Sequence, residues 1–195
     1  MGEGETRAYA LAVRRVLITG AATSQPALRV TQAEAAARIS AAIGSERRIE
    51  ALARSTRIET RSIAVPAERI ARLTTVEERN GLYQDVAPAL AEAAVRRLHD
   101  WRADADFLVT ASCTGYMVPG LDVVLAQALG LPATTSRLPI TEAGCAGGVV
   151  ALSRAAEFLR AHPSSSKALV AAVELCSLAF QIGRASCRER VCLVV

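Results

Sequence analysis

One cysteine of the chain lies in a setting that suits nucleophilic chemistry. Cys145 sits in the segment TEAGCAGGVV, among alanine and glycine residues, between a predicted strand and a predicted helix. Glycines permit a sharp turn and let a ligand approach the backbone closely. A sulfur at a helix N-terminus lies at the positive end of the helix dipole, which favours the thiolate. The pattern predicts a nucleophile able to form a thioester with an acyl group, and a buried structural cysteine is the alternative.

The elements that must position this cysteine alternate between strand and helix. Helices are predicted over 31–44, 47–54, 75–101 (with interruptions at Gly81 and Pro88), 119–129 and 148–162. Strands are predicted over 13–19, 57–65, 106–111, 134–140 and 167–175. At the first helix, Thr31 and Glu34 have the spacing of a capping box. Such alternation predicts an α/β fold with a mainly parallel sheet.

Composition narrows the function classes further. The chain has 195 residues, 51% of them hydrophobic, which fits one domain with a real core. No apolar run reaches the roughly 18 residues of a membrane-spanning helix, and no secretory signal is visible, so a cytoplasmic location and reduced cysteines are expected. The net charge is +4 without a dense basic block, and no Cys/His cluster occurs, so neither nucleic-acid binding nor a metal site is expected.

Four sequence words resemble a known family. They are RIETR (57–61), SCTGYMVPGLDVVLAQALGL (112–131), AGCAGG (143–148) and ALVAAVELCS (168–177). Together they resemble the type III polyketide synthases, the chalcone synthase-like branch of the thiolase superfamily, and the Cys-Thr-Gly-Tyr wording is similar to the bacterial group. The resemblance implies that residues 1–181 form the N-terminal half of a thiolase-like fold, which is layered αβαβα.

The last fourteen residues, 182–195, depart from this pattern. They read IGRASCRERVCLVV, with three arginines, two cysteines and no amphipathic period. The first ten match the translation of a widely used sequencing adapter. We therefore expect this tail to be adapter read-through and exclude it from the fold, with a genuine basic C-terminus as the alternative.

The resemblance assigns roles to individual residues. It implies that Cys145 is the acyl-accepting nucleophile and that Val118 reaches across a dimer interface into the neighbour's cavity. It places the substrate-binding positions at Cys113, Thr114, Val118, Cys176 and Ala179. Basic residues near the second helix, including Arg54 and Arg57, lie where related enzymes place cations for coenzyme A phosphates, and a solvated helix face is the alternative.

The resemblance also implies a reaction. The cysteine accepts a starter acyl group from acyl-CoA, and malonyl-CoA then extends it by decarboxylative condensation, with no bound cofactor and in a homodimer. In the family a His and an Asn from the C-terminal half assist. The resemblance therefore implies that the parent gene encodes an acyltransferase. His99 and His162 match neither position, so we expect the 195-residue chain itself to have little condensation activity. A ketoacyl-ACP synthase of the initiating type and a non-catalytic fragment or pseudoenzyme are the alternatives.

Overall fold

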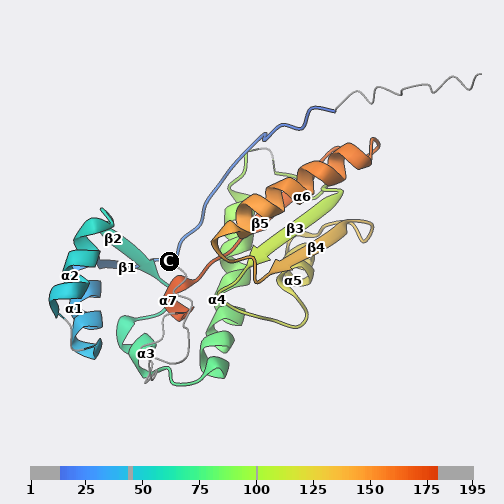
Figure 1. Cartoon of the computed structure of the whole chain (residues 1–195). Helices are drawn as coiled ribbons and strands as arrows, with labels where there is room; N and C mark the ends of the chain where they lie inside the picture. Colours follow the sequence, from blue (N-terminus) through green and yellow to red (C-terminus); the bar gives the residue numbers. More distant parts are fainter. Residues whose placement is uncertain (1–13, 44–45, 100, 180–195) are drawn as a thin grey trace, which may run out of the picture.

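A three-stranded parallel sheet forms the centre of the molecule. The computed structural model describes residues 14–43, 46–99 and 101–179, and Figure 1 shows their arrangement. Strand β3 (Phe107–Ser112) lies between β4 (Ser136–Thr141) and β5 (Ala168–Ala172), in parallel with both. The first five residues of β3 are buried, as expected for an apolar run in a parallel sheet covered on both faces.

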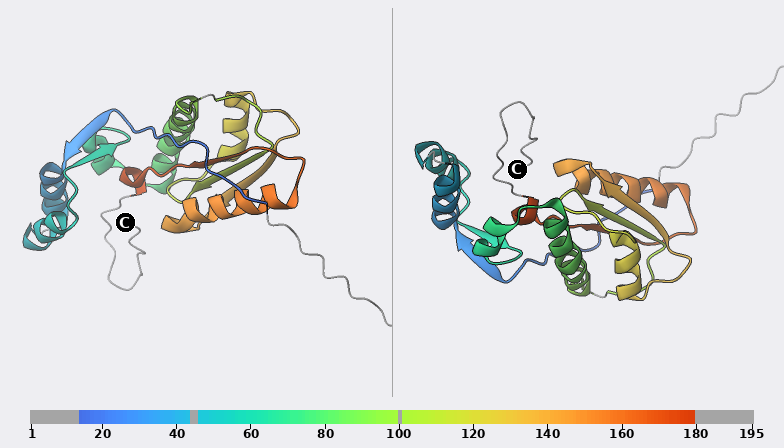
Figure 2. Two further views of the ribbon diagram at one scale, coloured as in Figure 1. Left: turned by 90° about the horizontal axis from the view of Figure 1, so that it is seen from above. Right: turned by 90° about the horizontal axis from the view of Figure 1, so that it is seen from below.

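Helices cover the two faces of this sheet. Helix α6 (Gly147–Ala161) packs on one face, while α4 (Val76–Arg96) and α5 (Leu121–Leu129) cover the other, so that the sheet forms the middle layer in both views of Figure 2. Leu108 of β3 belongs to the core cluster on the α4–α5 side, and its neighbour Val109 belongs to the cluster with α6. Successive side chains of β3 thus pack into two separate cores, one on each face of the sheet.

Local signals set the ends of these helices. Helix α4 starts at a capping box in which the backbone N–H of Glu78 donates to Thr75 Oγ1, 3.1 Å away, and the Thr75 N–H donates to the Glu78 carboxylate, also at 3.1 Å. The helix continues through Gly81 and Pro88, where the sequence predicted interruptions. Helix α5 ends at Gly130, which takes the left-handed conformation (φ 66°).

A second, smaller unit precedes α4 in the chain and lies outside the parallel sheet. It consists of β1 (Leu28–Thr31), α1 (Gln32–Ile43), α2 (Glu46–Ser55) and β2 (Thr60–Ile63), with β1 and β2 antiparallel. The predicted capping box is confirmed, since the Glu34 N–H donates to Thr31 Oγ1 at 3.1 Å. Figure 1 shows this unit beside the sheet layers rather than over them. The chain returns where the Ala64 N–H donates to Ser177 Oγ at 3.1 Å and continues into α3 (Ala67–Arg72).

Two strand predictions need correction. The described part of the segment predicted as a strand over 13–19 is extended but belongs to neither sheet, and Leu17 and Ile18 are 71% and 76% exposed. An apolar run predicts extended backbone, whereas a strand also requires a neighbouring edge with which to pair. The strand predicted over 57–65 is shorter, because Arg57 adopts φ 54° in the turn after α2 and β2 begins only at Thr60.

Arg14 holds the extended segment by other means. Its guanidinium donates to the carbonyls of Leu159, His162, Pro163 and Ser165 at 2.9–3.3 Å. These carbonyls lie at the carboxyl end of α6, where the helix dipole favours a cation.

Some sequence predictions concern residues that the structure does not describe. The predicted end of the first helix at Gly44 and the predicted adapter tail over 182–195 lie outside the described residues, so both remain predictions. Within the described residues, no helix combines the length and the apolar character needed to cross a bilayer.

Candidate active site

The three described cysteines follow the carboxyl ends of the three sheet strands. Cys113 comes directly after β3, Cys145 follows β4, and Cys176 opens α7 (Cys176–Ala179), which follows β5. Because the strands are parallel, these ends meet at one edge of the sheet, where α/β proteins commonly bind ligands. The thiols of Cys145 and Cys176 influence the Cys113 thiol electrostatically. The structure therefore brings together three cysteines that the sequence named separately.

Cys145 occupies the predicted junction between strand and helix. After β4 the backbone turns through Glu142 and Gly144, both at positive φ (61° and 57°), into a short 3-10 turn over Gly144–Ala146. Helix α6 follows at once, and the Cys145 side chain is exposed. A Cβ on Gly147 would approach the Ala111 Cβ to 3.4 Å, so the glycine lets α6 start close against β3. The nucleophile candidate is thus solvent-accessible and lies two residues before the buried Gly147, where α6 begins.

Glu174 links the chain after β5 to the chain after β3. The Cys113 backbone N–H donates to both Glu174 carboxylate oxygens, at 3.0 and 3.2 Å. In the opposite direction, the Leu175 N–H donates to Thr114 Oγ1 at 2.8 Å. The Val173 N–H continues the sheet pairing by donating to the Ala111 carbonyl at 2.9 Å. These bonds clamp the two segments that carry Cys113 and Cys176 and place a carboxylate beside them.

The surroundings raise the pKa of two of the three thiols. Burial, followed by the charge and hydrogen bonding of Glu174, raises the pKa of Cys113 to about 11. Partial burial of the sulfur, in a side chain that stays exposed overall, and then Glu174 also raise the pKa of Cys176. A backbone hydrogen bond at Cys176 and the positive charge of Arg61 on β2 partly offset this rise. Desolvation and a nearby negative charge both disfavour the thiolate. Cys113 and Cys176 are therefore neutral thiols near pH 7.

The loop after β3 is fixed on α4. A Cβ on Gly115 would lie 1.9 Å from Cγ of the buried Tyr83, so the backbone rests directly on that aromatic ring. The Tyr116 N–H donates to Asn80 Oδ1 at 2.6 Å. Beyond these contacts the loop projects outward, and Tyr116 and Val118 are 64% and 77% exposed. Val118, expected to reach a neighbouring subunit, is thus presented on the surface.

Helix α7 places the last two predicted site residues. Leu178 is buried, while its neighbours Cys176 and Ala179 are exposed. Arg79 of α4 holds the element by donating to the Leu178 carbonyl at 3.1 Å. Cys176 and Ala179 therefore present small side chains to solvent at the edge of the sheet that carries Cys145.

The predicted coenzyme A cations lie elsewhere. Arg54 is exposed near the end of α2 and pairs with Glu50 at 3.7 Å, and Arg57 is exposed in the following turn. This turn precedes Thr60, at the outer end of β2, whereas the Ile63 end leads back to the body (Figure 1). The structure does not bring these two arginines to the cysteines, and their role remains a prediction. Arg61 is a cation that acts on Cys176, and its Nε donates to Gln32 Oε1 at 2.7 Å.

The two histidines lie away from Cys145. His162 follows the carboxyl end of α6, where it stacks on Phe158 with ring centroids 4.1 Å apart, whereas Cys145 precedes the amino end. A 15-residue helix spans about 22 Å. His99 follows α4 at the end opposite Asn80, which contacts the loop after β3. Neither histidine is placed to assist the Cys145 thiol.

Sequence analysis missed Glu174 and Arg61 as site residues. Glu174 is an isolated acidic residue directly after a buried apolar strand, and this pattern could have drawn attention to it. Arg61 belongs to the RIETR word, but only the fold shows that β2 returns toward α7. Both assignments required knowledge of which strand ends lie side by side.

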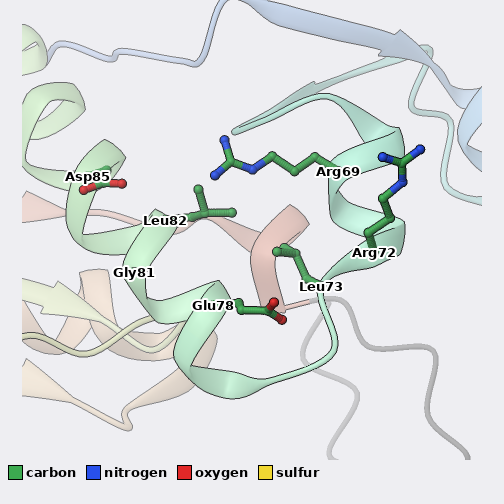
Figure 3. Close-up of a pocket in the computed structure, with 7 residues that line it drawn as sticks. All are labelled: Arg69, Arg72, Leu73, Glu78, Gly81, Leu82 and Asp85. Carbon is green, nitrogen blue, oxygen red and sulfur yellow. The ribbon is translucent and has the colours of Figure 1, made fainter.

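A separate pocket lies between α3 and α4, as Figure 3 shows. It has a volume of about 390 Å³ and is lined by Arg69, Arg72, Leu73, Glu78, Gly81, Leu82 and Asp85. Of its two carboxylates, Glu78 is already bonded to Thr74 and Thr75. The pocket contains none of the predicted site residues. Within the described ranges, no group of three or more His, Cys, Asp or Glu side chains could hold a metal ion.

The chain is similar to bacterial proteins of one enzyme class. It is 36% identical over 134 residues to a 1,3,6,8-tetrahydroxynaphthalene synthase from Streptomyces coelicolor, a match covering 67% of this chain and 36% of the relative. It is 35% identical over 175 residues to an alpha-pyrone synthesis polyketide synthase-like protein from Mycobacterium tuberculosis, covering 83% and 44%. The chain thus spans less than half the length of these relatives.

Solved structures share the fold. The crystal structure of the Streptomyces coelicolor tetrahydroxynaphthalene synthase, described as a bacterial type III polyketide synthase, matches with a TM-score of 0.74 and 31% identity, over 83% of this chain and 48% of that chain. The predicted thiolase-like α/β fold is confirmed by this likeness. The family model described as chalcone and stilbene synthases, N-terminal domain, matches residues 8–193. On this match over nearly its whole length, the chain belongs to the chalcone and stilbene synthase family, as an N-terminal domain.

Proposed function

We propose that Cys145 is the acyl-accepting nucleophile of a type III polyketide synthase. The observation that carries the proposal is the position of this residue. It is an exposed cysteine at the carboxyl end of a parallel strand and directly before α6, beside two cysteines whose surroundings keep them as thiols. The family membership supports the same assignment, because the AGCAGG word containing Cys145 resembles the nucleophile word of that family.

The proposed reaction has two steps. The Cys145 thiolate attacks the carbonyl carbon of an acyl-CoA thioester, a new carbon–sulfur bond forms, and coenzyme A leaves as its thiolate. Malonyl-CoA then loses carbon dioxide, and the resulting carbanion attacks the acyl carbon held on Cys145. The new carbon–carbon bond releases the Cys145 thiolate and leaves the extended chain on coenzyme A. No bound cofactor takes part in either step.

The names of the relatives limit what can be proposed about the product of the reaction. By their names, one makes 1,3,6,8-tetrahydroxynaphthalene, another serves alpha-pyrone synthesis and a third, from Pseudomonas fluorescens, is a phloroglucinol synthase. We therefore propose the condensation that such polyketide products share rather than one of the products. The starter unit, the number of extensions and the mode of cyclisation depend on the shape of the complete cavity.

Other residues of the chain would shape the substrate site. We propose that Cys113, Thr114, Cys176 and Ala179 line the acyl cavity of the complete enzyme. Small or weakly polar side chains at Cys176 and Ala179 leave room for a long or apolar acyl chain. We also propose a homodimer in which Val118, which is strongly exposed beyond β3, reaches the partner's cavity.

The 195-residue chain should perform the first step more readily than the second. The family resemblance implies that a His and an Asn from the C-terminal half stabilise the charges that develop during condensation. His99 and His162 lie away from Cys145, so they do not replace that histidine. We therefore expect acyl loading without efficient extension.

Acyl loading is tested with acyl-CoA thioesters of several chain lengths and site-resolved mass spectrometry. We expect the acyl mass on the Cys145 peptide, its loss in Cys145→Ala and its retention in Cys113→Ala as the matched control. A folded protein that acquires no acyl group on Cys145 would contradict the proposal. Loading only from an acyl-carrier protein, and not from coenzyme A, would favour the ketoacyl-ACP synthase alternative.

A further inference from the structure

The proposed function requires a choice among three thiols. Cys113, Cys145 and Cys176 meet at one edge of the sheet, yet a defined acyl intermediate needs a single acceptor. Thiol and thiolate differ greatly in nucleophilicity, so the choice can be made by controlling which cysteine ionises. The following inference rests on the proposed acyl transfer to Cys145 and names the residue that makes the choice.

Glu174 is fixed beside two of these cysteines. Both of its carboxylate oxygens accept the Cys113 backbone N–H, at 3.0 and 3.2 Å. The segment that carries Glu174 is held by the neighbouring bonds from the Val173 N–H to the Ala111 carbonyl and from the Leu175 N–H to Thr114 Oγ1, at 2.9 and 2.8 Å. Cys176 follows two residues later in the chain. The carboxylate therefore acts on two thiols from a fixed position.

We propose that Glu174 is a positioning residue that directs acylation to Cys145, because its carboxylate is fixed on the Cys113 backbone and places a negative charge beside the two neighbouring cysteines. The same carboxylate fixes the Cys113 backbone by accepting its N–H. Glu174 thus gives the three cysteines at this edge of the sheet different reactivities toward an acyl group.

Most groups facing these two thiols raise their pKa, and the exceptions, a backbone hydrogen bond at Cys176 and the charge of Arg61, act on Cys176. Besides burial, the charge of Glu174 and the electrostatic influence of Cys145 raise the pKa of both Cys113 and Cys176. Tyr83 of α4 borders this group, and burial is the main cause of its own raised pKa. Arg61 of β2 lowers the pKa of Cys176. The other nearby cation, Arg79 of α4, is bonded to the backbone carbonyls of Leu178 and Leu73. A thiolate on Cys145 therefore opposes ionisation of its two neighbours.

Removal of the charge alone tests the proposal. In Glu174→Gln the amide carbonyl can still accept the Cys113 N–H, so the clamp is kept while the negative charge is lost. We measure alkylation of each cysteine by iodoacetamide from pH 7 to 10, resolved by peptide mass spectrometry. We expect the Cys113 rate at pH 8.5 to rise several-fold in this variant, because burial still raises the thiol pKa but the charge of Glu174 no longer adds to it. Glu174→Asp should restore slow labelling, and Glu157→Gln on α6 is the matched control for loss of one carboxylate.

The outcomes separate this inference from the proposed function. Unchanged Cys113 labelling in a folded Glu174→Gln protein overturns the inference. Should that variant not fold, the unmodified protein provides a second test, because a Cys113 labelling midpoint near pH 9 instead of about 11 also overturns it. Alkylation needs no acyl-CoA, so failure of acyl loading on Cys145 contradicts only the proposed function. When both hold, Glu174→Gln incubated with acyl-CoA shows acyl groups on Cys113 as well as on Cys145.

Discussion

At the scale of single residues, the site depends on side chains that differ little in size but greatly in surroundings. Cys113 and Cys145 are both cysteines at strand ends, yet only Cys113 lies beneath a carboxylate and is partly buried. The chemistry expected of each therefore follows from its neighbours rather than from its type. Sequence analysis identified Cys145 because its glycine-rich setting is local, and it missed Glu174 because that residue acts across a gap of 61 residues.

Ala179 offers a prediction about substrate size. Its methyl group is exposed at the end of α7, on the edge of the sheet that carries Cys145. We expect Ala179→Phe to lower kcat/KM for long acyl-CoA starters about tenfold relative to short ones, because an aromatic ring would occupy volume that a long chain needs. The measurement uses the complete enzyme and a series of acyl-CoA thioesters. Ala161→Phe, at the far end of α6, is the control, and an unchanged chain-length preference in Ala179→Phe would contradict the assignment.

Gly115 offers a prediction about stability. Since the position of its absent Cβ lies 1.9 Å from the Tyr83 ring, Gly115→Ala must displace the loop or the buried aromatic side chain. We expect a loss of about 1–3 kcal/mol in the free energy of unfolding, which is typical of overpacking. Urea denaturation measures this loss. Gly81→Ala is a matched control, since no atom lies within 4 Å of the added Cβ and alanine favours the helix. Equal stability of the two variants would rule out the close contact.

At the scale of elements, hydrogen bonds between strand ends hold the sheet in register. Asp106, directly before β3, accepts the backbone N–H groups of Ser166 and Lys167 at 2.7 and 3.1 Å, just before β5. At the other end of the same strands, Glu174 and Thr114 repeat this arrangement. The β3–β5 pair is thus fastened at both ends by side chains that bind backbone.

The Asp106 contact predicts a pH dependence. The backbone bonds from Lys167 and Ser166 hold the pKa of the Asp106 carboxyl below its usual range. A carboxyl whose pKa is lowered by folding stabilises the native state above its ordinary pKa, and this contribution is lost as the pH falls through the lowered value. We expect Asp106→Asn to be less stable than the parent at pH 6 and to lose less stability between pH 5 and pH 3. Urea denaturation across this range, with Glu157→Gln as control, checks the sign. Parallel pH curves for Asp106→Asn and the parent would contradict it.

The elements also show what a sequence can predict. Strand β3 and helices α5 and α6 were found because an apolar run, a glycine stop and a helical period are local properties. Helix α4 was predicted as well. The short helix α3 before it and the short strand β1 were not predicted. The segment from Arg14 to Thr19 was misassigned because pairing depends on a partner strand, and no local pattern reports whether one lies alongside. In the same way, Glu174 became visible only once the sheet order was known.

At the scale of the whole molecule, the described residues form one sheet with its covering helices and a smaller unit beside it (Figure 1). The chain spans 36–44% of the length of the tetrahydroxynaphthalene synthase and alpha-pyrone synthesis relatives. On the outer face of α6, Val149 and Leu152 are exposed although both are apolar. These two side chains lie three residues apart and give α6 a small exposed apolar surface.

Sequencing of the genomic locus through codon 181 tests the origin of the tail. We expect the reading frame to continue past Gln181 into a second half that carries the His and Asn of the family, because 182–191 match a translated adapter. The match of the family model extends through residue 193 and so includes most of this tail. A genome that encodes IGRASCRERVCLVV followed by a stop codon would show the tail to be native and would favour the non-catalytic alternative.

The bond between Cys113 and Glu174 has a consequence for the order in which the protein is made. Its two partners are 61 residues apart, and β4 and α6 lie between them in the chain. Such distant pairing forms late, because a long loop must close before its contacts are gained. On the ribosome, Cys113 and Cys145 therefore emerge before the carboxylate that lies over Cys113. A nascent chain stalled before β5 would expose both thiols to solvent, and the three cysteines would come together only when β5 joined the sheet.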